Sequence, residues 1–161
     1  MTWINKSTLL WIVILVFLLF SLLGFITADV IVIQADKSKL QPVFGEIYFQ
    51  NLKVALIILF GGIITAGIIP LVILIQNSIM FGVGIKNASY SFENLQYILT
   101  HGVLEMPMFV LFTFISLRLT YEIYTSRKND ISIRKLTILS IIAFIGLTLA
   151  ALIETFITPQ L

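Results

Sequence analysis

The sequence predicts an all-α fold, a polytopic integral membrane bundle of four to five transmembrane helices. Of its 161 residues, 59% are hydrophobic and only 11% are charged, whereas about a quarter of the residues in a soluble domain carry charge. So few charges cannot cover the surface of a globular domain. Long apolar runs also alternate with short polar connections along the whole chain. We therefore expect a single transmembrane domain over residues 1–161.

The first apolar run extends from Thr8 to Val30. Lys6 precedes it, as a cation precedes the apolar core of a secretory signal peptide. However, the run is longer than the roughly 7–15 residues of such a core. We expect a retained transmembrane helix at about 8–30. The mixed loop that follows, 31–50, contains aromatic residues that suit the membrane interface.

The next apolar run covers 51–87, which is long for one span and short for two. As one helix it would measure roughly 55 Å, while a span needs about 20 residues. The run contains these small or helix-breaking residues: Gly61, Gly62, Gly67, Pro70, Gly82 and Gly84. They predict a broken helix or a hairpin of two short helices, and the later glycines favour close helix packing. A single overlong, tilted helix is the alternative.

Three further elements follow. Residues 91–100 are amphipathic and predict an interfacial or re-entrant helix. Two more spans are expected at 103–124 and 136–158. Pro107 falls in the first turn of the earlier one, where proline is tolerated.

The connection between the last two spans contains clustered cations: Arg127, Lys128, Arg134 and Lys135. Because cytoplasmic loops are enriched in Lys and Arg, we expect residues 125–135 to be cytoplasmic and to form a docking loop. With four spans the N-terminus is then outside, and with five spans it is inside.

Two carboxylates and one histidine lie near the predicted membrane surface. His101 and Glu105 are four residues apart, a spacing that brings side chains together on a helix. Glu105 begins one predicted span and Glu154 ends the next, so antiparallel neighbouring helices would place both glutamates at the same face. Such a pair suits a proton relay or a cation site. Alternatively, Glu105 only interacts with the helix dipole and Glu154 lies among lipid headgroups.

Arg118 lies deep in the span 103–124. It is thirteen residues from Glu105, about 220° around the helix, so these two cannot pair along it. Glu122, one turn away, is the expected local partner. We interpret Arg118 as a snorkelling arginine near the cytosolic end of the span. The alternative is a contact to a partner subunit or a lipid phosphate.

The composition excludes several kinds of site. Cysteine is absent and there is one histidine, so thiolate or multi-histidine metal sites are excluded. No nucleophile, base and acid can be assembled into a catalytic set. We expect no metal, no cofactor and no enzymatic activity. The small net charge of +2 lies mainly in loops, so we also expect no binding to nucleic acid.

Several short motifs follow one another in the last two-thirds of the chain. A glycine-rich run after Asn51 leads to Asn77 and Gly82, and His101-Gly-Val-Leu-Glu-Met-Pro107 comes next. Glu154-Thr-Phe-Ile-Thr-Pro159 lies near the end. From residue 51 onward, this order and spacing resemble the stage II sporulation protein M family.

The resemblance implies a small multi-pass protein of the bacterial cell membrane without catalysis of its own. Short members of the family accompany circular bacteriocin production, and the short first loop of this chain favours that group. The implied role is maturation, export or self-immunity. The implied partners are other membrane subunits, an ATP-binding-cassette ATPase and a peptide substrate. Association of the chain with further copies of itself is a further option.

Other functions stay open beside this one. One is a sporulation scaffold for engulfment, which other members of the family imply, with partners that remodel peptidoglycan. Another is a small ion- or proton-coupled transporter or channel that uses Glu105 and Glu154. An intramembrane hydrolase built on His101 and Glu105 is the least complete alternative, because no nucleophile accompanies them.

Overall fold

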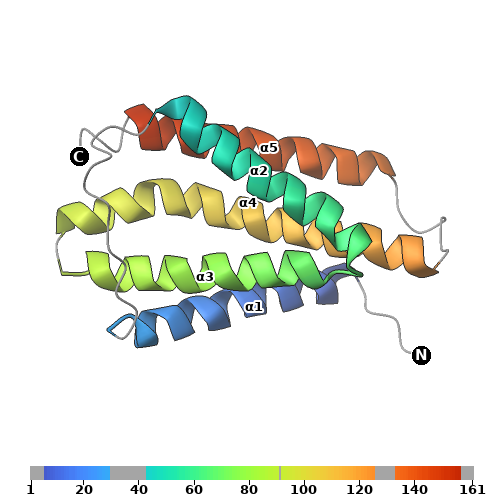
Figure 1. Ribbon diagram of the computed structural model, residues 1–161, viewed down its shortest axis with the longest axis horizontal. Coiled ribbons are helices and arrows are strands. Elements are labelled where there is room, and N and C mark those ends of the chain that lie inside the picture. The colour runs from blue at the N-terminus through green and yellow to red at the C-terminus, as the bar shows by residue number, and fades with distance from the viewer. Residues whose placement is uncertain (1–5, 30–42, 91, 126–132, 157–161) are drawn as a thin grey trace.

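The apolar runs form five α-helices that lie along one common long axis (Figure 1). The computed structural model describes residues 6–29, 43–90, 92–125 and 133–156. Its helices are α1 (Lys6–Thr27), α2 (Phe44–Ile64), α3 (Ile68–Ala88), α4 (Phe92–Thr125) and α5 (Ile133–Phe156). All five are long and apolar enough to cross a membrane. The all-helical membrane bundle is confirmed, and the described residues contain five candidate spans rather than four.

The run 51–87 is divided between two helices that form a hairpin. Gly67 has φ +92°, in the left-handed region that favours glycine. Thr65 stabilises the turn on both sides: its Oγ1 donates to the Gly61 carbonyl oxygen over 2.7 Å and accepts from the Ile69 N–H over 3.0 Å. The expected hairpin is therefore present and breaks at Gly67. Gly61 and Gly62 lie inside α2, and Pro70 lies in the first turn of α3.

Helix α4 is the central helix of the bundle. Figure 1 shows it with α2 and α5 on one side and α1 and α3 on the other, and it contacts all four. Two apolar cores result. Ala55, Ile58, Phe109, Phe112, Ala143 and Leu147 form one between α2, α4 and α5. Val13, Leu74 and Val110 form the other between α1, α3 and α4.

Helices α1 and α3 approach each other closely at two glycines. A Cβ atom added to Gly24 would collide with the Ile79 carbonyl oxygen, and one added to Gly82 would collide with the Ser21 carbonyl oxygen. Small residues allow this backbone approach between membrane helices. Gly82 therefore has the packing role expected for it, whereas Gly84 lies within α3 without interrupting it.

Two predicted boundaries were wrong. Helix α2 begins at Phe44 rather than at 51, since the mixed segment continues the helix and the rings of Phe44 and Tyr48, one turn apart, stack at 5.6 Å. Residues 92–101 continue directly into α4, so the interfacial helix at 91–100 is not a separate element. Pro107 lies on an exposed face of α4 and does not end it.

The alternating helix directions give the bundle two ends. We call one the basic end: it contains the start of α1, the turn 65–67, the end of α4 and the start of α5. We call the opposite one the acidic end. Between them the outer faces are apolar, with exposed side chains such as Leu15, Phe60 and Ile142. Such a surface suits contact with lipid chains.

Candidate functional site

Glu105 on α4 and Glu154 on α5 lie together at the acidic end. Both side chains are partly buried, and they are close enough for their carboxylates to interact electrostatically. The structure therefore brings together the two glutamates that the sequence places at one face. In a low-dielectric setting, a shared proton or a bound cation would relieve the repulsion between them.

Asn51 on α2 belongs to the same level of the bundle and was not singled out as a site residue from the sequence. Its exposed fraction is only 9%. It precedes Ala55 by one turn, and Glu105 precedes Phe109 by one turn; Ala55 and Phe109 share one core. Because α2 and α4 run in the same direction, Asn51 and Glu105 lie at similar depth. The acidic end therefore has an amide as well as two carboxylates within its spans.

His101 lies in α4 one turn before Glu105, and its side chain is outside the described part of the structure. Among the residues that the structure describes, no group of three or more His, Asp or Glu side chains is arranged to hold a metal ion.

Arg118 and Glu122 form an ion pair inside the bundle at the basic end. The Arg118 Nη2 lies 3.1 Å from the Glu122 Oε1, and the two side chains are 7% and 15% exposed. The guanidinium carbon also lies 5.8 Å from the centroid of the Tyr121 ring. The expected pairing is found, but the snorkelling interpretation was wrong because the guanidinium is enclosed by protein.

A ladder of hydroxyl groups joins α4 to the end of α2, and the sequence did not reveal it. Ser116 Oγ donates to the Ile58 carbonyl oxygen over 2.6 Å, and Tyr124 Oη donates to the Ile63 carbonyl oxygen over 3.3 Å. The second bond satisfies a carbonyl group in the last turn of α2, where no helical N–H follows. The sequence shows that Ser116 and Tyr124 are eight residues apart on one helix, but it does not show which helix their hydroxyl groups contact.

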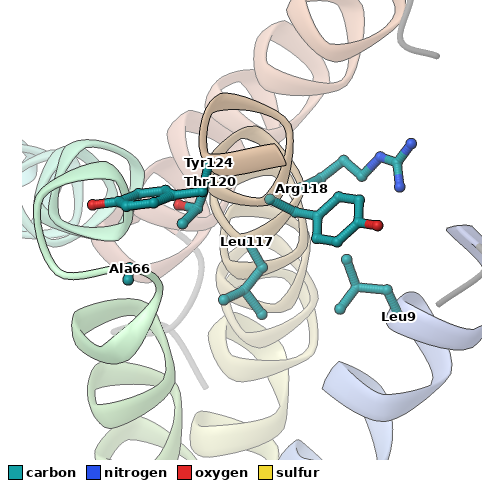
Figure 2. A pocket seen from close by; sticks show the side chains of 7 residues that line it. Leu9, Ala66, Leu117, Arg118, Thr120 and Tyr124 are labelled. Atoms are coloured by element: carbon teal, nitrogen blue, oxygen red, sulfur yellow. The ribbon is translucent and has the colours of Figure 1, made fainter. Parts of the chain in front are cut away.

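A cavity of about 390 Å³ lies beside this ladder at the basic end. Its walls come from three elements: Leu9 of α1, Ala66 of the turn, and Leu117, Arg118, Thr120, Tyr121 and Tyr124 of α4. Figure 2 shows Leu117 pointing into the space between Leu9 and Ala66. In the same view, Tyr124 lies on the side of the turn and the Arg118 guanidinium on the opposite side of α4, toward α1. The site is therefore apolar inside and polar at its edges.

Charge is distributed unevenly between the two ends. By their place in the chain, six cations belong to the basic end: Lys6, Arg118, Arg127, Lys128, Arg134 and Lys135. Two acidic residues, Glu122 and Asp130, accompany them. The other four cations are Lys37 and Lys39 of the connection between α1 and α2, Lys53 in the middle of α2, and Lys86 near the end of α3. By their place in the chain, six acidic residues belong to the acidic end: Asp29, Asp36, Glu46, Glu93, Glu105 and Glu154.

Of the predicted docking loop, Arg134 and Lys135 are exposed in the first turn of α5. Arg127 and Lys128 lie outside the described residues. The positions of the two described cations are consistent with a surface that is accessible to a partner.

Comparison with known proteins identifies the family. The sequence matches the stage II sporulation protein M family over residues 13–159, which includes most of α1 and all the later helices. The chain belongs to this family. It is also similar to an uncharacterized protein of Methanocaldococcus jannaschii, with 31% identity over 169 aligned residues that cover 92% of this chain and 94% of that protein. No solved structure matches the chain.

Membership in the stage II sporulation protein M family accounts for the multi-pass helical architecture. The relative from Methanocaldococcus jannaschii is archaeal, and the alignment covers almost all of both chains. A protein of this kind is therefore not restricted to bacteria, so the bacterial cell membrane stays a prediction. One fold can support several functions, and the residues of the site determine which one a protein has.

Proposed function

We propose that the chain is a non-enzymatic membrane subunit of a multi-component complex for circular bacteriocin maturation, export or self-immunity. In this proposal its basic end is cytoplasmic and binds an ATP-binding-cassette ATPase. The observation that supports it most is that six of the ten cations belong, by their place in the chain, to one end of the bundle. The family membership agrees with a subunit that acts through partners.

The orientation follows from the distribution of Lys and Arg. The connection between α4 and α5, with the first turn of α5, contains four cations within nine residues, 127–135. The connection between α1 and α2 contains two, Lys37 and Lys39. Short loops rich in Lys and Arg stay in the cytoplasm. With five spans, the N-terminus and residues 126–132 are on the same, cytoplasmic side.

Co-purification tests the docking role. Replacing Arg127, Lys128, Arg134 and Lys135 by glutamine removes the cations of the loop without altering an apolar core. We expect the ATPase to be lost from the purified complex. Lys37→Gln with Lys39→Gln is the matched control at the acidic end and should leave the complex intact. ATPase retention by the four-site variant would contradict the docking role.

A sporulation scaffold with peptidoglycan-remodelling partners is the second candidate, and the name of the matching family favours it. Neighbouring genes distinguish the two. A peptide-precursor gene beside an ATPase gene supports the bacteriocin complex, whereas a sporulation operon and a sporulation defect on deletion support the scaffold.

Ion or proton transport is the third candidate, and the electrostatic contact between Glu105 and Glu154 favours it. Flux into liposomes containing the purified protein tests this. If the pair conducts, Glu105→Gln and Glu154→Gln each reduce flux, while Glu46→Gln, in the first turn of α2, does not. Equal flux in all four proteins would remove this candidate.

A further inference from the structure

We propose that the cavity at the basic end binds one anionic phospholipid from the adjoining leaflet. The lipid would place an acyl chain inside the cavity and its phosphate at the polar edge. This inference rests on the cavity and on the charge of the basic end. It does not depend on the identity of the protein partner proposed above.

The interior of the cavity suits a hydrocarbon chain. Leu9 and Leu117 approach it from two helices, and Ala66 forms its wall at the turn (Figure 2). Its volume of about 390 Å³ falls in the range of sites that hold small molecules, about 300–1,000 Å³. Helix α1 packs mainly against α3 and only lightly against α4. The side of the cavity next to α1 is therefore the natural entrance for an acyl chain from the bilayer.

The edge of the cavity suits a phosphate group. Tyr121 and Tyr124 line it in the last turns of α4, the depth at which tyrosine meets the membrane interface. Six of the chain's ten cations lie at this end by their place in the chain, including Lys6, which precedes Leu9 by three residues. Basic pockets between transmembrane helices on the cytoplasmic side are a recurring type of lipid-headgroup site.

A free phosphate ion fits this site less well than a lipid. Arg118 is the one cationic residue among the described residues that line the cavity. Its Nη2 already lies 3.1 Å from the Glu122 Oε1. A soluble anion would therefore gain only the diffuse attraction of the basic end, whereas a lipid adds the burial of its acyl chain.

Native mass spectrometry of the full chain tests the proposal with two probes of equal acyl length, phosphatidylglycerol and phosphatidylcholine. We expect one phosphatidylglycerol to bind at least about tenfold more tightly than phosphatidylcholine, about 1.4 kcal/mol. Leu9→Trp should fill the cavity and abolish this preference. Leu15→Trp, on the exposed face of the same helix, should preserve it. Leu117→Trp repeats the block from α4 if the Leu9 variant does not fold.

Each contrary outcome would overturn the proposal. Equal retention of the two lipids would remove the role of the headgroup charge. Unchanged phosphatidylglycerol binding in a folded Leu9→Trp or Leu117→Trp protein would place the lipid elsewhere. Displacement of the lipid by millimolar inorganic phosphate would assign the site to a soluble anion instead.

Discussion

The Arg118 guanidinium lies 3.1 Å from the Glu122 carboxylate in the C-terminal part of α4, and both side chains are nearly enclosed by protein. Removing one partner leaves a buried, unpaired charge, which costs about 3–5 kcal/mol in folded proteins. We expect Glu122→Gln to lower the free energy of unfolding in detergent by an amount of this order. Thermal unfolding followed by circular dichroism measures it.

The matched control removes both charges. Arg118→Met with Glu122→Leu should recover most of the lost stability, because apolar residues of similar volume often replace a buried ion pair at little cost. A Glu122→Gln protein as stable as the parent protein would show that the pair does not stabilise the bundle.

Gly62 allows α2 to approach α4. A Cβ atom added there would collide with the Ser116 Oγ and would lie 3.0 Å from the Pro70 Cγ. We expect Gly62→Ala to destabilise the protein by about 1–3 kcal/mol, the usual cost of overpacking, although alanine normally favours a helix over glycine. Chemical denaturation in mixed micelles measures the difference.

Gly45→Ala is the control for this substitution, since an added Cβ meets nothing within 4 Å there. It should leave stability unchanged or slightly higher. The account of the α2–α4 contact would be wrong if both alanine variants had the stability of the parent protein.

Local features of the fold could be predicted from the sequence. The glycines around residue 67 predicted the hairpin because a left-handed residue is needed between the two helices, and Gly67 occupies that position. The four-residue spacing of Arg118 and Glu122 predicted their ion pair because it depends on α4 alone. Glu105 and Glu154 come together because consecutive antiparallel helices bring the start of one beside the end of the other.

Features that depend on the pairing of distant helices could not be predicted in this way. The bond from Ser116 to Ile58 joins residues 58 positions apart and requires knowledge of which face of α2 meets α4. The burial of Arg118 was missed for the same reason: helix periodicity gives the direction of a side chain but not what covers it. The polar residues Glu93, Asn94 and Gln96 suggested a separate interfacial helix, whereas residues 92–101 are the first part of α4.

Gly82 allows the close approach of α1 and α3. A Cβ atom there would collide with the Ser21 carbonyl oxygen and lie 2.8 Å from the Phe25 nitrogen, and neither backbone can yield as a flexible side chain does. We expect Gly82→Leu to separate α1 from α3. Cysteine cross-linking can report it, since the chain has no native cysteine: Val13→Cys and Leu74→Cys introduce a pair within the second core.

The cross-link should form in the parent background and be largely lost with Gly82→Leu. Gly45→Leu, introduced at an open position, should preserve it. Equal cross-linking in the Gly82→Leu background would show that the two glycines do not determine how α1 packs.

In the proposed topology, the five-span bundle presents its basic end to the cytoplasm. Single cysteines at Asn5, Ser38 and Asn129 test it in intact cells with a maleimide that does not cross the membrane. We expect Ser38→Cys to react from outside, and Asn5→Cys and Asn129→Cys to react only after the membrane is permeabilised. Labelling of Asn129→Cys from outside, or of Asn5→Cys and Asn129→Cys from opposite sides, would contradict the account.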